Sequence, residues 1–144
     1  MIRKIVTNKE QLAIPSVEIY GEELIKEIVQ DLKDTAMHYA KSKVGCVGLA
    51  ANQINYLHRI ILVNHGGKWI VMVNPVIDRV EGCKTSLAGE GCLSRPGVKK
   101  KVRRDKIILV TWLDEDGEGH HEQIKGFSAR VIQHEVDHLN GKFI

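Results

Sequence analysis

One short segment near the C-terminus constrains this fold more than any other. Gln133–His138 reads Q-H-E-V-D-H, which contains the pattern H-E-x-x-H. In a helix, His134 and His138 stand at positions i and i+4, so both imidazoles leave the same face one turn apart. Two neutral imidazoles placed in this way can bind one divalent metal ion. Glu135 follows about 100° round the helix, where it can act on a water molecule without ligating the metal.

The residues before this segment predict that the same helix face points inward. Phe127, Val131, His134, Glu135 and His138 follow the i, i+4, i+7, i+8, i+11 spacing of an inward-facing stripe. A carboxylate and two imidazoles on such a face need polar partners, and a metal ion with its water would satisfy all three. The alternative is a surface helix that carries two histidines by chance. A catalytic metal site also requires a third protein ligand from elsewhere in the chain.

Length and composition narrow the class of protein. The 144 residues predict a single domain, residues 1–144, that is large enough for a hydrophobic core. No apolar run reaches about 18 residues and the N-terminus lacks a signal-peptide core, so we expect no membrane span and a cytoplasmic location. The net charge of +3 does not by itself indicate nucleic-acid binding, and no nucleic-acid motif is present. Three cysteines, an odd number, favour a reducing compartment with free thiols.

The hydrophobic pattern predicts an α+β fold. Residues 1–20, which contain Pro15, should be irregular, and an amphipathic helix should run from Gly21 to about Ser42. Antiparallel strands should follow, then the metal-binding helix from about Phe127, ended by Asn140–Gly141. The expected strands are residues 59–63 and 69–74, joined by a turn and closed by Pro75, and residues 107–112 and 120–124 around an Asp-Gly turn.

Two further segments carry candidate chemistry. Residues 44–54 are rich in small side chains and include Gln53, which indicates either a backbone that approaches a ligand closely or a tight packed loop. Cys92 lies in the segment E-G-C-L-S and is a candidate soft metal ligand, although a free cysteine is often only a small buried hydrophobe. The basic run 97–106 is interpreted as a solvated strand face rather than a phosphate or ribosome contact.

Taken together, three segments resemble the peptide deformylase family, which is marked by G-x-G-L-A-A-x-Q, E-G-C-L-S and Q-H-E-x-D-H in that order. Here residues 46–53 read C-V-G-L-A-A-N-Q, residues 90–94 read E-G-C-L-S and residues 133–138 read Q-H-E-V-D-H. Cys46 replaces the first glycine of the family pattern. The sequence also stops at Ile144, so it resembles compact bacteriophage members that lack the C-terminal extension thought to help dock on the ribosome.

The resemblance implies a fold with antiparallel β-sheets around a central C-terminal helix, and an activity. Such a protein removes formate from the N-terminal formylmethionine of nascent peptides at the ribosome, in the bacterial cytoplasm or, if phage-encoded, in that of the host. The resemblance also implies one divalent metal ion per chain, with ferrous iron favoured and zinc, nickel or cobalt as substitutes. Ligand chemistry alone would suggest zinc.

The resemblance also assigns roles to residues. The metal ligands are Cys92, His134 and His138, and Glu135 is the general base. The Gln53 side-chain amide and the Leu93 backbone N–H would stabilise the oxyanion. The residues implied in substrate binding are Val47, Gly48 and Gly91 beside the peptide, and Phe127, Arg130 and Val131 near the methionine pocket.

Two other classes of protein would use the same helix. An H-E-x-x-H endopeptidase would cut internal amide bonds, but it normally takes a His or Glu as third ligand rather than a cysteine. A binding module stapled by a metal would need a closed site of four ligands, with Cys83 and Cys46 as the spare thiols.

Overall fold

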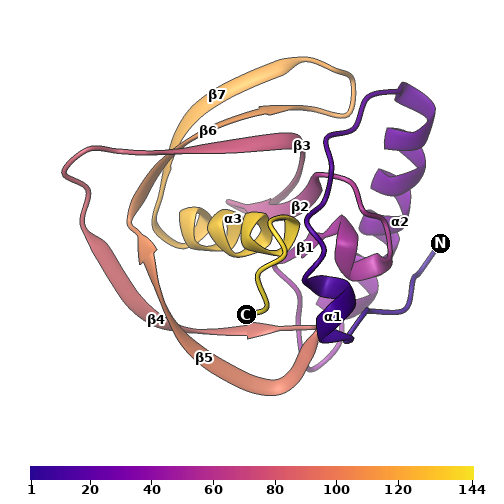
Figure 1. Cartoon of the computed structure of the whole chain (residues 1–144), viewed down its shortest axis with the longest axis horizontal. Coiled ribbons are helices and arrows are strands. Elements are labelled where there is room, and N and C mark those ends of the chain that lie inside the picture. Colours follow the sequence, from indigo (N-terminus) through magenta and orange to yellow (C-terminus); the bar gives the residue numbers. More distant parts are fainter.

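The computed structural model describes all of residues 1–144. A C-terminal helix, α3, lies at the centre and is surrounded by strands, as Figure 1 shows. One antiparallel sheet has the strand order β1-β2-β3-β6-β7, and a separate two-stranded sheet pairs β4 with β5. This arrangement confirms the expected α+β class.

The helices are α1 (Lys9–Leu12), α2 (Glu22–Ala40), the 3-10 helix η1 (Ala51–Ile54) and α3 (Gly126–Leu139). The strands are β1 (Gly48–Ala50), β2 (Ile60–His65), β3 (Lys68–Arg79), β4 (Thr85–Cys92), β5 (Arg95–Asp105), β6 (Ile107–Leu113) and β7 (Gly119–Lys125).

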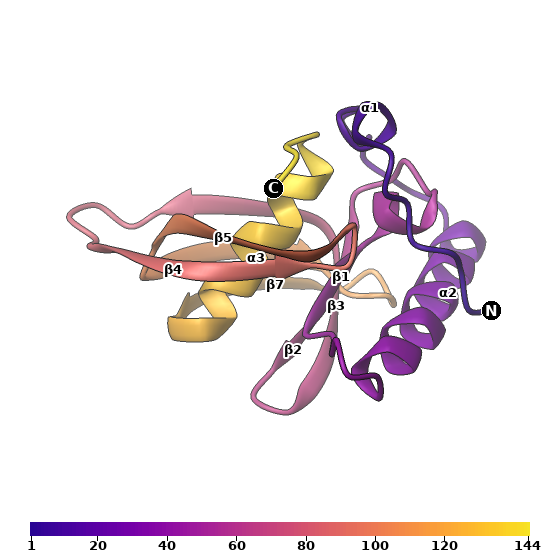
Figure 2. The same cartoon turned by 90° about the horizontal axis from the view of Figure 1, so that it is seen from below.

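Strand β2 explains how two helices share one sheet. Ile60 and Leu62 pack into the core beside α2, whereas Ile61 and Val63 pack into a second core beneath α3. Successive side chains of a strand point to opposite faces, so an uninterrupted apolar run is what a strand covered on both faces requires. Figure 2 shows α2 and α3 on either side of this part of the sheet.

The long amphipathic helix is confirmed as α2, and Asp31 is a buried polar residue on it. Asp31 is 6% exposed and accepts hydrogen bonds from the Met1 amino group (2.6 Å), Arg3 Nε (2.9 Å) and the Tyr56 hydroxyl (2.8 Å). Burial acts to raise the pKa of Asp31, but these hydrogen bonds outweigh it and lower the pKa. The ionised carboxylate therefore ties the N-terminal segment to α2.

Two expectations about local structure are wrong. Residues 1–20 are not wholly irregular, because Asn8 caps α1 by accepting a hydrogen bond from the Gln11 N–H at 2.9 Å. Pro75 does not end its strand, because β3 runs on to Arg79. A register shift between Val73 and Val76 marks an irregularity at this point, and a proline is tolerated where the ladder is interrupted.

The orientation of α3 decides which of its side chains reach the candidate site. Its apolar residues, among them Ala129, Ile132 and Leu139, are fully buried in the core shared with β2, β3 and β6. Its polar groups meet β1, η1 and β5, through Glu135 beside Gly48, the His138 carbonyl bonded to Asn52 and Gln133 bonded to Asp105. The inward stripe expected from the sequence is wrong at its first position, since Phe127 is 64% exposed. No helix of this protein combines the length and apolar character needed to cross a membrane.

Candidate active site

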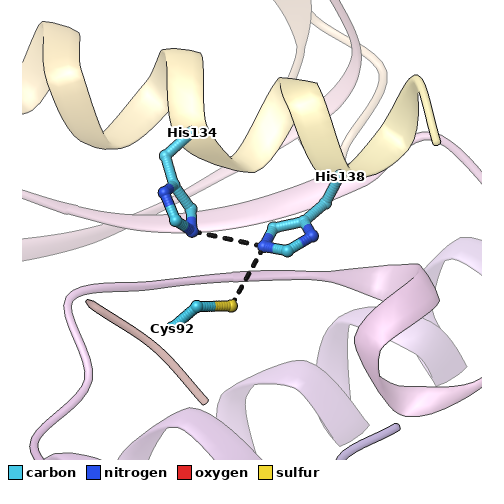
Figure 3. A group of neighbouring side chains, drawn as sticks. All are labelled: Cys92, His134 and His138. Atoms are coloured by element: carbon cyan, nitrogen blue, oxygen red, sulfur yellow. Dashed lines mark hydrogen bonds between the residues drawn. The ribbon is translucent and has the colours of Figure 1, made fainter. Parts of the chain in front are cut away.

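The structure brings together one thiol and two imidazoles from distant parts of the chain. The ligand atoms of Cys92, at the end of β4, and of His134 and His138, on α3, all lie within 4.8 Å of one another. His138 Nε2 is 3.2 Å from Cys92 Sγ and 3.2 Å from His134 Nε2. Figure 3 draws these two contacts as dashed lines. No other group of three or more His, Cys, Asp or Glu side chains in the protein is arranged to hold a metal ion.

These separations fit a metal ion. With metal–nitrogen bonds of about 2.0–2.1 Å and a metal–sulfur bond of about 2.3 Å, tetrahedral angles place two nitrogens about 3.4 Å apart and sulfur about 3.6 Å from nitrogen. The observed separations of 3.2 Å are only slightly shorter. His138 Nε2 contacts both other donor atoms, and all three lie within 4.8 Å of one another, so the donor set can converge on a single ion.

Glu90 fixes the orientation of the first imidazole. Its Oε1 lies 2.8 Å from His134 Nδ1, so a proton on Nδ1 leaves Nε2 free to face the cluster. Glu90 also accepts hydrogen bonds from Arg104 Nη2 (2.9 Å) and Arg130 Nη1 (2.6 Å), and Arg104 pairs further with Asp137. Burial acts to raise the pKa of Glu90, but hydrogen bonds from His134 and the two arginines lower it to about 2. Glu90 is therefore a permanent anion beside the candidate metal centre.

The two imidazoles have opposite pKa shifts. Burial lowers the pKa of His138 to about 3, so its ring is neutral, as a metal ligand must be. Burial acts in the same direction on His134, but its hydrogen bonds with Cys92 and Glu90 outweigh burial and raise the pKa to about 10. Negative neighbours that hold a proton on His134 would equally attract a divalent cation.

Glu135 lies beside this cluster in a tight space. It is 4% exposed, and its Oε1 has no hydrogen-bond partner. Burial is the main cause that raises the pKa of Glu135 to about 7. The backbone of Gly48 passes so close that a Cβ atom there would lie 2.7 Å from Glu135 Oε2 and 2.8 Å from Val131 Cγ1. Any side chain at position 48 would therefore displace the Glu135 carboxylate, and only glycine avoids this.

Gln53 and Leu93 flank the thiol. Gln53 Nε2 donates to Cys92 Sγ at 3.4 Å and to Ser94 Oγ at 3.0 Å, while its Oε1 accepts from the Ala50 N–H at 3.0 Å. The amide is therefore held at both ends, with its nitrogen between the Ser94 hydroxyl and the Cys92 thiol. Leu93 follows Cys92 directly in the turn between β4 and β5.

The cluster opens into a cleft of about 770 Å³ that Cys92, His134 and Glu135 help to line. All the residues implied in substrate binding also line it: Val47, Gly48, Gly91, Phe127, Arg130 and Val131. Arg130 does more than line the cleft, because its guanidinium donates to Glu90, to the Val102 carbonyl (2.9 Å) and to the Ser86 carbonyl (2.8 Å). It thereby attaches both strands of the small sheet to α3.

The other two cysteines stand outside the cluster. Cys46 is half-buried at the cleft, its Sγ donates to the Gly48 carbonyl at 3.4 Å, and burial raises the pKa of this thiol to about 12. The Cys83 Sγ instead bonds the Lys84 and Ile107 carbonyls. Neither joins the group that could hold a metal, which contradicts the closed four-ligand site of a stapled binding module.

Sequence reasoning missed three contacts that build the site, two made by Arg104 and one by Asn52. Glu90 and Asp137 stand inside the recognised motifs, but only their partner Arg104, on β5, shows what they do. Asn52 Nδ2 donates to the His138 carbonyl at 2.7 Å and so ties η1 to the last turns of α3. One signal in the sequence could have indicated that Arg104 points inward. Side chains alternate along a strand, so Arg104 lies on the same face of β5 as the partly buried Val102.

The whole chain is similar to proteins of one known family. The family model described as polypeptide deformylase matches residues 2–144. The peptide deformylase of Dictyoglomus thermophilum is 42% identical over 85% of this chain and 76% of its own. Among solved structures, a class I type b peptide deformylase from Acinetobacter baumannii superposes with a TM-score of 0.89 at 28% identity, covering 99% of this chain and 96% of that chain. A probable peptide deformylase from synechococcus phage S-SSM7 gives 0.86 at 32% identity, covering 98% and 96%.

Proposed function

This chain belongs to the peptide deformylase family, whose members are metal-dependent hydrolases that remove the formyl group from N-terminal methionine, and we propose that it does so at the Cys92–His134–His138 cluster. The observation that carries this proposal is the convergence of Cys92 Sγ and both histidine Nε2 atoms beside an open cleft. Three protein ligands leave the fourth corner of a tetrahedral site open, as catalysis requires.

The ligand set fits several metals. A divalent ion held there would act as a Lewis acid on the formyl carbonyl and would lower the pKa of a water molecule. We propose ferrous iron as the native metal, as the resemblance to the family implies. Zinc, nickel or cobalt could substitute for it, because thiolate and imidazole ligands accept all four metals. An iron enzyme should lose activity in air as the iron or the Cys92 thiolate is oxidised, whereas a zinc enzyme would lose it only by thiol oxidation.

Glu135 is the proposed general base. Its pKa of about 7 allows it to accept a proton from the attacking water and return it to the leaving amine near neutral pH. Burial keeps bulk water away from the carboxylate, and the unpartnered Oε1 leaves one oxygen available for the proton.

Gln53 and Leu93 are the proposed donors to the oxyanion. The Gln53 amide is pinned by the Ala50 N–H, so its own N–H groups are oriented before substrate arrives. The Leu93 backbone N–H lies one residue after the Cys92 ligand. A single donor of this kind is typically worth about 10²–10³ in kcat.

The walls of the cleft suggest how a peptide is held. Strand β1 is the edge of its sheet and β4 pairs only with β5, so each offers a free edge to an extended peptide. The apolar side chains of Val47, Phe127 and Val131 line the same cleft and would hold the methionine side chain. We assign the substrate as formylated nascent chains met at the ribosome, in the bacterial cytoplasm or, for a phage protein, in that of its host.

The decisive experiment measures formate release and bound metal in one anaerobic sample, with formyl-Met-Ala-Ser as substrate. The wild-type protein should bind one metal ion per chain and release formate. Glu135→Gln should keep the metal and lose about 10²–10⁴ in kcat. The matched control is Glu122→Gln, an exposed carboxylate on β7 that should change neither quantity. Full activity in a metal-loaded Glu135→Gln protein would refute the role of this carboxylate.

A further inference from the structure

The rim of the cleft carries unpaired positive charge. Charged side chains that line the cleft include Glu90, Glu135, Arg95, Lys99 and Arg130. The two carboxylates are buried, at 7% and 4% exposure, so they belong to the interior of the site rather than to its rim. Arg130 is paired with Glu90. Arg95 and Lys99 remain, and neither takes part in any ion pair of this protein.

Strand pairing places both cations next to the candidate metal ligand. Arg95 is the partner of Cys92 in the β4–β5 ladder, and Lys99 is the partner of Gly91, one residue away. Residues directly opposite in an antiparallel pair have Cα atoms about 4.5–5.5 Å apart. A Cβ on Gly91 would meet nothing within 4 Å, so the space across from Lys99 is open. The Arg95 guanidinium is held 4.8 Å above the Phe143 ring, which limits its freedom without neutralising it.

The positive charge continues outward from the cleft. Lys101 and Arg103 follow Lys99 at alternate positions of β5, so the three side chains share one face of the strand. Both of these residues are exposed and unpaired with any carboxylate. A peptide that leaves the cleft along the small sheet therefore meets these cations first. The one acidic side chain at the same alternate positions of β5 is Asp105 at its far end, which is paired with Arg79 at 3.5 Å.

We propose that this protein prefers formylmethionyl peptides with acidic residues shortly after the methionine, and that Arg95 and Lys99 select them. This inference rests on the proposed function, because it takes the formyl group to lie beside Cys92 and the methionine to lie in the apolar part of the cleft. The following residues must then pass the rim. Their carboxylates would meet the two unpaired cations, whereas lysine or arginine side chains would be repelled.

The expected effect is moderate because the contacts are solvent-exposed. An exposed ion pair is worth about 1.5- to 5-fold in an equilibrium, so two pairs should favour an acidic peptide over a neutral one by about 2- to 25-fold in kcat/KM. These contacts persist from bound substrate to transition state, so KM should change and kcat should not. Raising ionic strength to 1 M shortens the screening length to about 3 Å and should abolish the preference.

Three C-terminally amidated peptides test the proposal: formyl-Met-Ala-Glu-Glu, formyl-Met-Ala-Ser-Ser and formyl-Met-Ala-Lys-Lys. Amidation removes the terminal carboxylate, which would otherwise mimic an acidic residue. The wild-type kcat/KM should fall in that order at low salt. Lys99→Glu alone should weaken or abolish the preference, because one cation and one anion then face the peptide, and Lys99→Glu combined with Arg95→Glu should reverse the order. The matched control is Lys68→Glu in the β2–β3 hairpin. Lys68 is exposed and lies outside the cleft lining, so this variant should keep the wild-type order of the three peptides.

Equal kcat/KM for the three peptides, or an order that survives the double variant, would overturn the proposal. Calorimetric binding of the matching unformylated peptides separates it from the proposed function. Suppose that Met-Ala-Glu-Glu binds more tightly than the other two unformylated peptides, but no formylated peptide releases formate. That result would refute the proposed deformylase activity while supporting the selection of acidic peptides. Equal binding of all three unformylated peptides would refute the charge selection even in an active enzyme.

Discussion

Replacing Gly48 by alanine tests how closely β1 must approach the helix that carries Glu135. The new Cβ would lie 2.7 Å from Glu135 Oε2 and 2.8 Å from Val131 Cγ1. Both side chains are nearly buried, at 4% and 5% exposure, so neither can turn into solvent to make room. Gly48 does not have a positive φ, so the expected strain comes from crowding alone. Overpacking of this kind costs about 1–3 kcal/mol of unfolding free energy.

The effect on activity should be larger than the effect on stability. Restoring an ordinary contact requires the Glu135 carboxylate to move by roughly 0.7 Å, and misplacement of a catalytic group by about 1 Å can cost about 10²-fold in rate. We therefore expect kcat to fall about 10- to 100-fold. Metal content should stay at the wild-type level, because no metal ligand is among the atoms nearest to the added methyl group.

Three measurements on one preparation check this prediction. Urea unfolding followed by circular dichroism gives the stability, formate release gives kcat, and elemental analysis gives the metal content. Gly119→Ala on β7 is the matched control, since its added Cβ would meet nothing within 4 Å and the residue does not have a positive φ. A Gly48→Ala protein with wild-type kcat would show that the carboxylate position does not limit catalysis. An unchanged stability would show that β1 can move away.

The remaining predictions concern buried charge. Glu90→Gln should lower the unfolding free energy by about 3–5 kcal/mol, because the buried Arg104 and the largely buried Arg130 lose their shared carboxylate. It should also weaken metal binding about 10- to 100-fold. Chemical unfolding and chelator competition measure the two effects, and wild-type values in both would show that the network is dispensable. Cys92→Ser should weaken metal binding or change the preferred metal, since an alcohol replaces a soft thiolate. Unchanged affinity and metal selectivity in the same competition would remove Cys92 from the ligand set. Asp31→Asn should be less stable at pH 7 by about 1–3 kcal/mol. The pKa of Asp31 is lowered in the folded state, so its contribution is present above the unfolded pKa of about 3.9 and is lost as the pH falls through the folded value. The wild-type protein should therefore lose more stability than Asp31→Asn between pH 5 and pH 3, and parallel unfolding curves would contradict this.

Part of the candidate metal site could be predicted from the sequence, and part could not. The i, i+4 spacing of His134 and His138 predicts a shared helix face because a helix is periodic over a single turn. The choice of Cys92 over Cys46 and Cys83 is different. Spacing alone leaves it open, and family resemblance favours Cys92. The placement of β4 beside α3 brings that thiol to the imidazoles.

Strand boundaries show the same division. Apolar runs predict β2 and β6 well, because a strand covered on one or both faces leaves its period in the sequence. The Asp-Gly turn after β6 predicts the returning strand β7. Pro75 misled the prediction for β3, since the local rule that proline ends a strand was overridden by a shift in the pairing register. Register depends on two strands at once and cannot be read from either alone.

The sequence by itself determined the α+β class, the helix with its paired imidazoles, and the family. Each of these follows from periodicity or from short ordered motifs, which are properties of neighbouring residues. Only the tertiary structure decided that Glu90 is held by Arg104 and Arg130, that Gly48 leaves room for Glu135, and that Arg95 and Lys99 stand unpaired at the rim. These are contacts between residues far apart in the chain, and their energies depend on burial and on partners that exist only once the chain has folded.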